Sequence, residues 1–210
     1  MDTTALSQLS MAFPAFGDAS VLAFEVSGAF FLTDPNTCGV PRRIPCDPNC
    51  QKDILNINSA DALTIMPFDE WLSSGKNEKC DFLIFDSGTT KQKFVFCELT
   101  CSQQKYVDPS PGNIGKRAKA FNQIEKSWEA IYNSDNPIFR AYVLQFVEKI
   151  GIFGWRESNN SATQKHGASR SMRQFSRTPG SQSSITTYTA ISFGEHFNYI
   201  QVKHPAVYQW

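Results

Sequence analysis

The segment that decides the fold is Asp81-Phe-Leu-Ile-Phe-Asp-Ser-Gly-Thr-Thr90, followed directly by Lys91-Gln-Lys-Phe-Val-Phe-Cys-Glu-Leu-Thr100. Residues 81–85 form a short apolar run, residues 86–90 are rich in turn formers, and residues 91–100 have the composition of a second strand. Two strands around a short glycine-containing connection predict an antiparallel hairpin. Because the start of one antiparallel strand faces the end of the other, we expect Asp81 and Glu98 to lie close together.

A helix is expected after the hairpin, over residues 115–133. Apolar residues recur there at the three- and four-residue spacings of one buried helix face, at Phe121, Ile124, Trp128 and Ile131. Residues 139–146 are apolar on both sides of the chain and predict a strand inside the sheet, and residues 185–193 and 197–202 predict a closing pair of strands. This order predicts an α/β fold, with a mixed central sheet flanked by helices.

The other segments add detail to a single domain that covers residues 1–210, with its core at about 66–148. Residues 19–32 suit either a strand or a short buried helix, and Pro67 opens a short helix within residues 66–72. A Cys- and Pro-rich insertion at 34–50 and a Ser-rich basic loop at 157–185 are expected to be irregular.

Composition excludes several classes of protein. The 17 Phe among 210 residues are too many for a disordered chain, and 20 Lys and Arg balanced by 20 Asp and Glu argue against a generally basic coat for nucleic acid. The most apolar stretch, residues 21–32, is interrupted by Glu25 and is too short to span a membrane. We therefore expect no membrane association and a cytoplasmic location, where the six cysteines would stay reduced.

The two carboxylates of the hairpin have a chemical meaning of their own. Asp81 and Glu98 would offer oxygen ligands of the kind that Mg²⁺ or Mn²⁺ prefers. Such an ion can activate a water molecule and stabilise the charge that develops on a phosphodiester. The hairpin is therefore a candidate metal site for hydrolysis.

Three segments together resemble the PD-(D/E)XK, or restriction-endonuclease-like, nuclease superfamily: Cys80-Asp-Phe-Leu-Ile-Phe85, Phe94-Val-Phe-Cys-Glu-Leu-Thr100 and Lys119-Ala-Phe-Asn-Gln-Ile124. The similarity covers about residues 66–148. It implies that Asp81 and Glu98 bind the metal ion and that Gln123 is the glutamine of the following helix. It also implies a restriction-endonuclease-like fold and metal-dependent hydrolysis of DNA.

The sequence departs from the family motif at Thr100, which occupies the lysine position of E-x-K. A threonine hydroxyl can hold a water molecule but supplies no positive charge. Lys105, Lys116 or Lys119 could replace the lysine from another element, and Lys119 lies one helical turn from Gln123. The alternative is a subunit that keeps the nuclease fold for DNA binding or protein assembly without catalysis.

A third acid often joins the site in this superfamily, from an upstream helix. The sequence offers Glu70 and Glu25 as candidates. No spacing argument favours either residue, so both remain open.

The cysteines of the insertion form a separate pattern. Cys38, Cys46 and Cys50 could hold a structural Zn²⁺ with a fourth ligand from Cys80, Cys101 or a histidine. This arrangement would make the chain a zinc-stapled interaction protein. Buried free thiols are the alternative, since the usual C-x2-C spacing is missing.

Basic residues are unevenly distributed along the chain. Lys116 and Arg117 open the predicted helix, and Arg170 and Arg173 lie in the Ser-rich loop. Together these residues could contact a phosphate backbone, so DNA is the expected partner, and a protein partner or a homodimer is also open. A solvated basic loop is the competing interpretation.

Overall fold

The computed structural model describes residues 1–33, 53–72, 79–88, 90–157, 185–192 and 195–210. Their helices and strands, in chain order, are α1 (Thr3–Ala12), η1 (Pro14–Phe16), η2 (Ala19–Val21), β1 (Phe24–Thr33), β2 (Asp53–Pro67), α3 (Phe68–Trp71), β3 (Phe82–Asp86), β4 (Lys93–Ser102), η3 (Gln104–Tyr106), α4 (Lys116–Tyr132), α5 (Ile138–Val143), β5 (Glu148–Glu157), β6 (Ile185–Ser192), β7 (Glu195–Lys203) and β8 (Val207–Gln209). Within these residues, no helix has the length and apolar character needed to cross a membrane.

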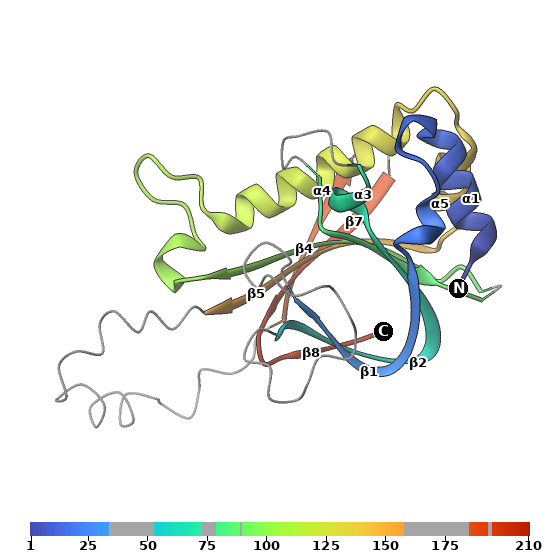
Figure 1. The fold of residues 1–210 in the computed structure, drawn as a ribbon. Helices are drawn as coiled ribbons and strands as arrows, with labels where there is room; N and C mark the ends of the chain where they lie inside the picture. The colour runs from blue at the N-terminus through green and yellow to red at the C-terminus, as the bar shows by residue number, and fades with distance from the viewer. Residues whose placement is uncertain (34–52, 73–78, 89, 158–184, 193–194) are drawn as a thin grey trace, which may run out of the picture.

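The strands form one mixed sheet in the order β1-β2-β3-β4-β5-β7-β6, with β8 paired to β2. The pairs β1/β2, β2/β3, β3/β4 and β6/β7 are antiparallel, whereas β4/β5 and β5/β7 are parallel. The sheet is strongly curved, and α1, α3, α4 and α5 lie on one side of it (Figure 1). The α/β class and the mixed sheet flanked by helices are therefore confirmed.

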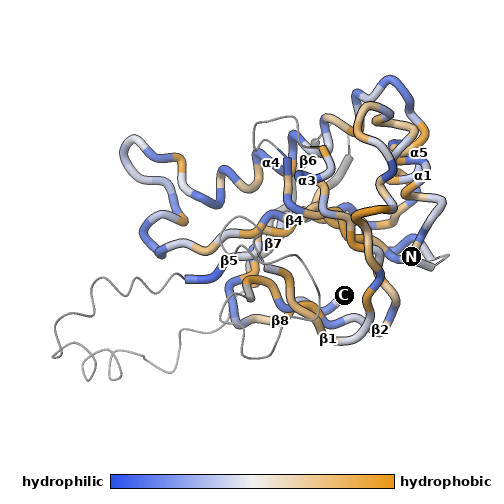
Figure 2. The backbone as a smooth tube through the Cα atoms, in the orientation of Figure 1, coloured by the Kyte–Doolittle hydropathy of each residue, from blue (hydrophilic) through white to orange (hydrophobic). Residues whose placement is uncertain are grey.

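Two hydrophobic cores form on opposite faces of the sheet because side chains alternate along each strand. On β4, Phe94 and Phe96 face the helices, whereas Val95 and Cys97 belong to the core on the other face. That second core is built, among the described residues, from strands and the C-terminal segment alone. The central strands are mostly hydrophobic, and the loop that leads from β4 to α4 is mostly hydrophilic (Figure 2).

Helix α4 connects the parallel strands β4 and β5 and packs over them. Its fully buried Trp128 lies 6.2 Å from Phe96 and 5.8 Å from Phe197, measured between ring centroids. Close contact with β5 depends on Gly151, where a Cβ atom would lie 3.1 Å from the side chain of Ile124. The helix predicted at residues 115–133 is confirmed, as are the strands of the hairpin.

The strand predicted at residues 139–146 is wrong. Residues 138–143 form helix α5, and the strand parallel to β4 follows at Glu148–Glu157. The apolar residues of this segment recur at helical spacing, and four of them are buried against the helical core: Phe139, Tyr142, Val143 and Phe146. Their spacing of three, four and seven residues indicated a helix, but their density on both sides of the chain suggested a strand.

Candidate functional site

Asp81 and Glu98 lie opposite each other at the open end of the β3/β4 hairpin, away from its turn. The strand register pairs Phe82 with Cys97, so the preceding and following residues also face one another. The backbone N–H of Asp81 donates to Glu98 Oε2 at 3.2 Å, and the N–H of Leu99 donates to Asp81 Oδ2 at 2.7 Å. The hairpin therefore brings the two carboxylates together, as the antiparallel pairing requires.

The alternation of β4 places Glu98 and Thr100 on the helix-covered face of the sheet. Phe94 and Phe96 lie in the core beneath the helices, and residues 98 and 100 continue the same alternation. Both side chains are half-buried, whereas Asp81 is only 5% exposed. The site is thus a partly covered acidic position next to α4.

A third carboxylate, Asp69 of α3, adds to the negative potential at the neighbouring Cys80. The N–H of Phe68 donates to the backbone carbonyl of Asp81 at 2.8 Å, which holds the start of α3 against the site. Burial raises the pKa of the Cys80 thiol well above its usual range; a hydrogen bond with Ser127 opposes this shift, and the charges of Glu98, Asp81 and Asp69 add to it. The charges of Asp81, Glu98 and Asp69 therefore all disfavour the thiolate form of Cys80.

The sequence offered two other acids for this role. Glu70 is exposed on α3, and Glu25 forms an ion pair with the N-terminal amino group of Met1. Asp69 and Glu70 are neighbours in sequence, and the packing of α3 against β3 makes Asp69 half-buried and leaves Glu70 exposed. Since a four-residue helix has no periodicity to read, the sequence carried no signal for this residue.

Gln123 and Ser127 attach the segment before β3 to helix α4. The Gln123 Nε2 donates to the carbonyl of Lys79 at 3.3 Å. The Ser127 hydroxyl accepts from the N–H of Cys80 at 2.7 Å and donates to the carbonyl of Gln123 at 2.7 Å. Gln123 therefore fixes the backbone next to Asp81, and Ser127, which the sequence did not single out, completes this attachment.

Lys119 lies one turn before Gln123 on the same side of α4, and its side chain is exposed. The next residue, Ala120, shows where this turn lies along the strands of the sheet, because it packs with Phe153 and Trp155 of β5. In the β4/β5 register, these two residues pair with Glu98 and Thr100. The first turns of α4 thus lie at the level of the acidic site.

The donor set fits a hard divalent cation. Two carboxylates on facing strands can bind Mg²⁺ or Mn²⁺ that keeps several water ligands, which is how proteins usually hold these ions. Over the described ranges, no group of three or more His, Cys, Asp or Glu side chains has a metal-binding arrangement. An ion at this site would accordingly use Asp81 and Glu98 with water.

The residues proposed for phosphate contact divide into two groups. Lys116 is exposed at the start of α4, whereas Arg117 donates to Gln201 Oε1 at 3.1 Å and forms an ion pair with Asp108. Arg117 therefore links the loop before α4 to strand β7. The remaining two candidates, Arg170 and Arg173, lie outside the described residues.

The candidate zinc ligands Cys38, Cys46 and Cys50 also lie outside the described residues. Among the described cysteines, Cys80 and Cys97 are buried free thiols and Cys101 is a half-buried one. Burial also raises the pKa of the Cys97 thiol well above its usual range, and the charge of Asp81 raises it further. The thiols of Cys80 and Cys97 are therefore protonated at neutral pH.

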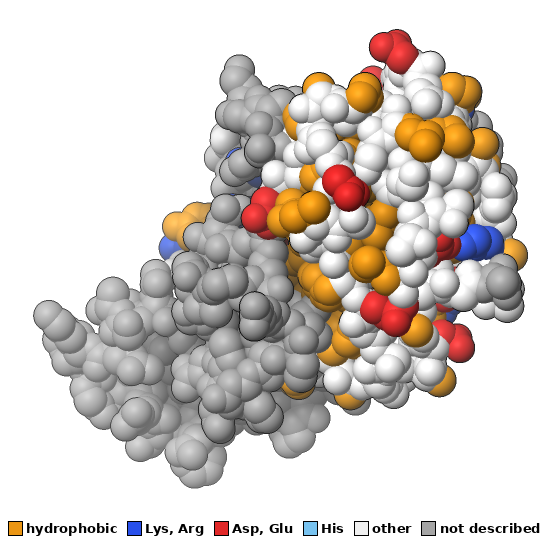
Figure 3. Space-filling model, turned by 45° about the vertical axis from the view of Figure 1, so that its right-hand side comes forward, with side chains coloured by type: hydrophobic (Ala, Val, Ile, Leu, Met, Phe, Trp, Pro, Cys, Tyr) orange, Lys and Arg blue, Asp and Glu red, His pale blue; other side chains and the backbone are white. Residues whose placement is uncertain are grey.

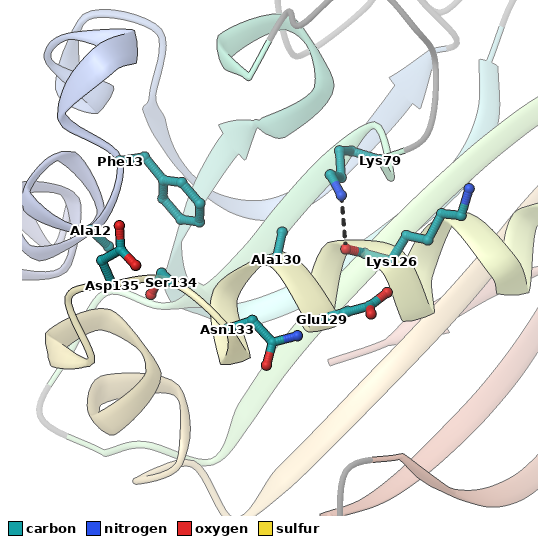
Figure 4. Close-up of a pocket in the computed structure, with 9 residues that line it drawn as sticks. All are labelled: Ala12, Phe13, Lys79, Lys126, Glu129, Ala130, Asn133, Ser134 and Asp135. Atoms are coloured by element: carbon teal, nitrogen blue, oxygen red, sulfur yellow. Dashed lines mark hydrogen bonds between the residues drawn. The ribbon is translucent and has the colours of Figure 1, made fainter.

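A groove of about 380 Å³ lies further along α4, between this helix and the end of α1 (Figure 4). The Nζ of Lys79 donates to the carbonyl of Lys126 at 3.0 Å across one wall of the groove. Basic and acidic side chains both line it, so it has no strong charge of one sign. Neither Asp81 nor Glu98 belongs to its lining, and the groove is distinct from the acidic site.

Comparison of this chain with protein-family models, with curated proteins and with solved structures finds no match.

Proposed function

We propose that the chain is a PD-(D/E)XK-like nuclease that hydrolyses DNA phosphodiesters with Mg²⁺ or Mn²⁺ at Asp81 and Glu98. The observation that carries this proposal is the pairing of the two carboxylates across β3 and β4, on the face covered by α4. The chain order also supports it, since the antiparallel strands β3 and β4 are followed by helices η3, α4 and α5 and then by β5, which is parallel to β4. This order agrees with a restriction-endonuclease-like core.

The surrounding residues have separate tasks in this proposal. A bound ion would supply the positive charge that activates water and stabilises the phosphodiester as it reacts. The N–H groups of Asp81 and Leu99 hold the two carboxylates in place, and Gln123 keeps the start of β3 against α4. Lys119, in the first turn of α4, would provide a positive charge to the site. The hydroxyl of Thr100 can orient a water molecule.

A second candidate function is a nuclease-fold subunit that binds DNA or assembles with a protein partner without catalysis. Two observations favour it. Thr100 replaces the motif lysine, and both carboxylates accept backbone hydrogen bonds, which gives them a structural task independent of any ion. A carboxylate that caps a backbone N–H is a common structural feature.

DNA cleavage distinguishes the two candidates. Wild-type protein and an Asp81→Asn/Glu98→Gln variant would be incubated with plasmid and with linear DNA in Mg²⁺, in Mn²⁺ and in EDTA. The matched control is Glu129→Gln, an exposed carboxylate on α4 that lines the groove of Figure 4. Metal-dependent cleavage by wild type and control, lost in the double variant, supports the nuclease. Equal, negligible cleavage by all three proteins would leave the binding subunit.

A further inference from the structure

Hydrogen bonds hold the loop between β4 and α4 in a defined conformation, although most of its residues are hydrophilic. Ser110 and Asn113 exchange two backbone hydrogen bonds of 2.8 Å, and the side chain of Asn113 accepts from the N–H of Gly115 at 3.0 Å. The N–H of Arg117 donates to the carbonyl of Val107 at 3.1 Å, and Val107 is buried. The loop is therefore held against the first turn of α4.

Positive charge is concentrated at this end of the molecule. Among the described residues, six basic ones lie in the loop, in the first turn of α4 and at the ends of β5 and β7: Lys105, Lys116, Arg117, Lys119, Arg156 and Lys203. The described acids there are Glu157 and Asp108, and Asp108 pairs with Arg117. The whole chain has a formal charge of zero. Figure 3 shows a different face of the molecule, on which Lys and Arg are few and acids are scattered. The chain thus has a net charge of zero but an excess of positive charge at this end of the described structure.

Lys203 connects β7 to this basic end. Its Nζ donates to Gln104 Oε1 at 3.3 Å and lies 4.8 Å from the centroid of the Trp155 ring. The short helix η3 consists of Gln104, Lys105 and Tyr106, so it carries one lysine of its own and is contacted by Lys203 of β7.

Exposed apolar side chains interrupt the charged surface. Tyr106 is 44% exposed and Ile114 is 52% exposed. The Nζ of Lys105 lies over the Tyr106 ring, 4.8 Å from its centroid. An aromatic ring beside several lysines combines a stacking surface with phosphate-binding charge, which is the usual composition of sites for single-stranded nucleic acid.

We propose that this surface binds single-stranded nucleic acid, with phosphates beside Lys116, Lys119 and Lys203 and one unpaired base stacked on Tyr106. A duplex keeps its base faces stacked inside, so only an unpaired base can use the exposed ring. The proposal deepens the nuclease function, on which it rests for its biological meaning, because it makes a single strand or an unpaired end the preferred substrate. The bound strand would pass the first turns of α4, which lie at the level of Glu98 and Thr100.

Binding is measured by fluorescence anisotropy in EDTA, so that cleavage cannot occur. The probes are labelled oligo-dT and oligo-U of about 16 nucleotides, the upper site size of common single-strand binding folds, and a blunt DNA duplex of the same length. The variants are Tyr106→Ala and Tyr106→Phe, together with Lys116→Ala and Lys119→Ala. The control for Tyr106 is Val21→Ala, which removes an exposed apolar side chain in the N-terminal part of the chain. The control for the two lysines is Lys126→Ala, which removes an exposed lysine about two turns further along α4.

We expect Tyr106→Ala to weaken single-strand binding by roughly 5- to 150-fold, the effect of one lost base stack. Tyr106→Phe should bind like wild type, because the ring remains. Each lysine variant should reduce the slope of log K against log salt by about 0.7, since one phosphate contact is lost. The duplex should bind more weakly, and its affinity should not respond to Tyr106→Ala.

Three results would overturn the proposal: no binding of either single strand, equal affinity of wild type and Tyr106→Ala, or the same loss for duplex and single strand. Binding of an acidic protein with no affinity for the oligonucleotides would overturn it as well. The nuclease proposal fails separately, if Tyr106-dependent binding persists but no cleavage follows when Mg²⁺ is added. Cleavage that is unaffected by Tyr106→Ala would leave the nuclease proposal standing and reject this one.

Discussion

Replacing Asp81 by asparagine separates a metal-binding role from a structural one. The Asp81 side chain is 5% exposed and accepts the N–H of Leu99 at 2.7 Å. Asparagine has the same shape and keeps an acceptor for this bond, so the loss of charge assistance should cost about 1 kcal/mol of unfolding free energy without metal. Alanine would leave the buried N–H of Leu99 without its acceptor and should cost about 1–3 kcal/mol more.

Metal binding changes this comparison because it stabilises only the folded protein. At ten times the dissociation constant, Mn²⁺ should stabilise wild type by about 1.4 kcal/mol. For a domain of this size, that free energy corresponds to a rise in Tm of roughly 3–6 °C. Asp81→Asn should lose most of this rise, and its Tm in EDTA should lie roughly 2–4 °C below that of wild type, as the loss of about 1 kcal/mol requires.

The assay is a thermal unfolding scan in EDTA and over a titration of Mn²⁺, with circular dichroism as the readout. Glu129→Gln is the control, since it removes an exposed carboxylate from the same layer of the molecule. A wild-type Tm that does not change with millimolar Mn²⁺ would refute the metal site. An equal rise in wild type and Asp81→Asn would show that the ion binds elsewhere.

Three further predictions concern the loop, the N-terminus and the missing lysine. Gly115→Ala should weaken oligonucleotide binding in anisotropy without unfolding the sheet, because residue 115 has φ +83° and a Cβ would lie 2.6 Å from the backbone of Asp108. Asp2 should stabilise the fold above about pH 4 and lose this effect at lower pH: burial alone would raise its pKa, but hydrogen bonds from Lys91, the N–H of Ala5 and Tyr142 lower it below the usual value. Urea midpoints at pH 7 and pH 3 should therefore differ less for Lys91→Ala than for wild type. Under the proposed function Lys119 already supplies the charge of the E-x-K lysine, so Thr100→Lys should change the wild-type rate of plasmid nicking little but should increase it at least about tenfold in a Lys119→Ala background; no recovery in the double variant would contradict this role.

The hairpin and helix α4 were predictable because their signals are local. Turn residues separate two apolar runs at 81–100, and four apolar residues follow one helix face at 121–131. The proximity of Asp81 and Glu98 then follows from antiparallel geometry alone. No other contact of the site could be derived from the hairpin.

The remaining parts of the site depend on contacts between distant segments. Strand β2 is the longest strand, yet Asn56, Asn58 and Ser59 interrupt its apolar pattern, and its pairing with β8 joins residues about 150 positions apart in the chain. The start of α3 is held next to Asp81 by a hydrogen bond from the N–H of Phe68 to the carbonyl of Asp81. Such positions are set by tertiary packing, which the local pattern does not encode.

In the folded protein, the neighbours of Thr100 include the first turn of α4 as well as strand β4. In the family motif, the lysine rises from the same strand as the glutamate, two residues further on. Here Thr100 lies on the helix-covered face of the sheet. The first turn of α4, which contains Lys119, lies at the same position along the strands. Under the two proposals made above, Lys119 would lie beside the bound single strand, so this one residue would serve both the reaction and the binding of the substrate.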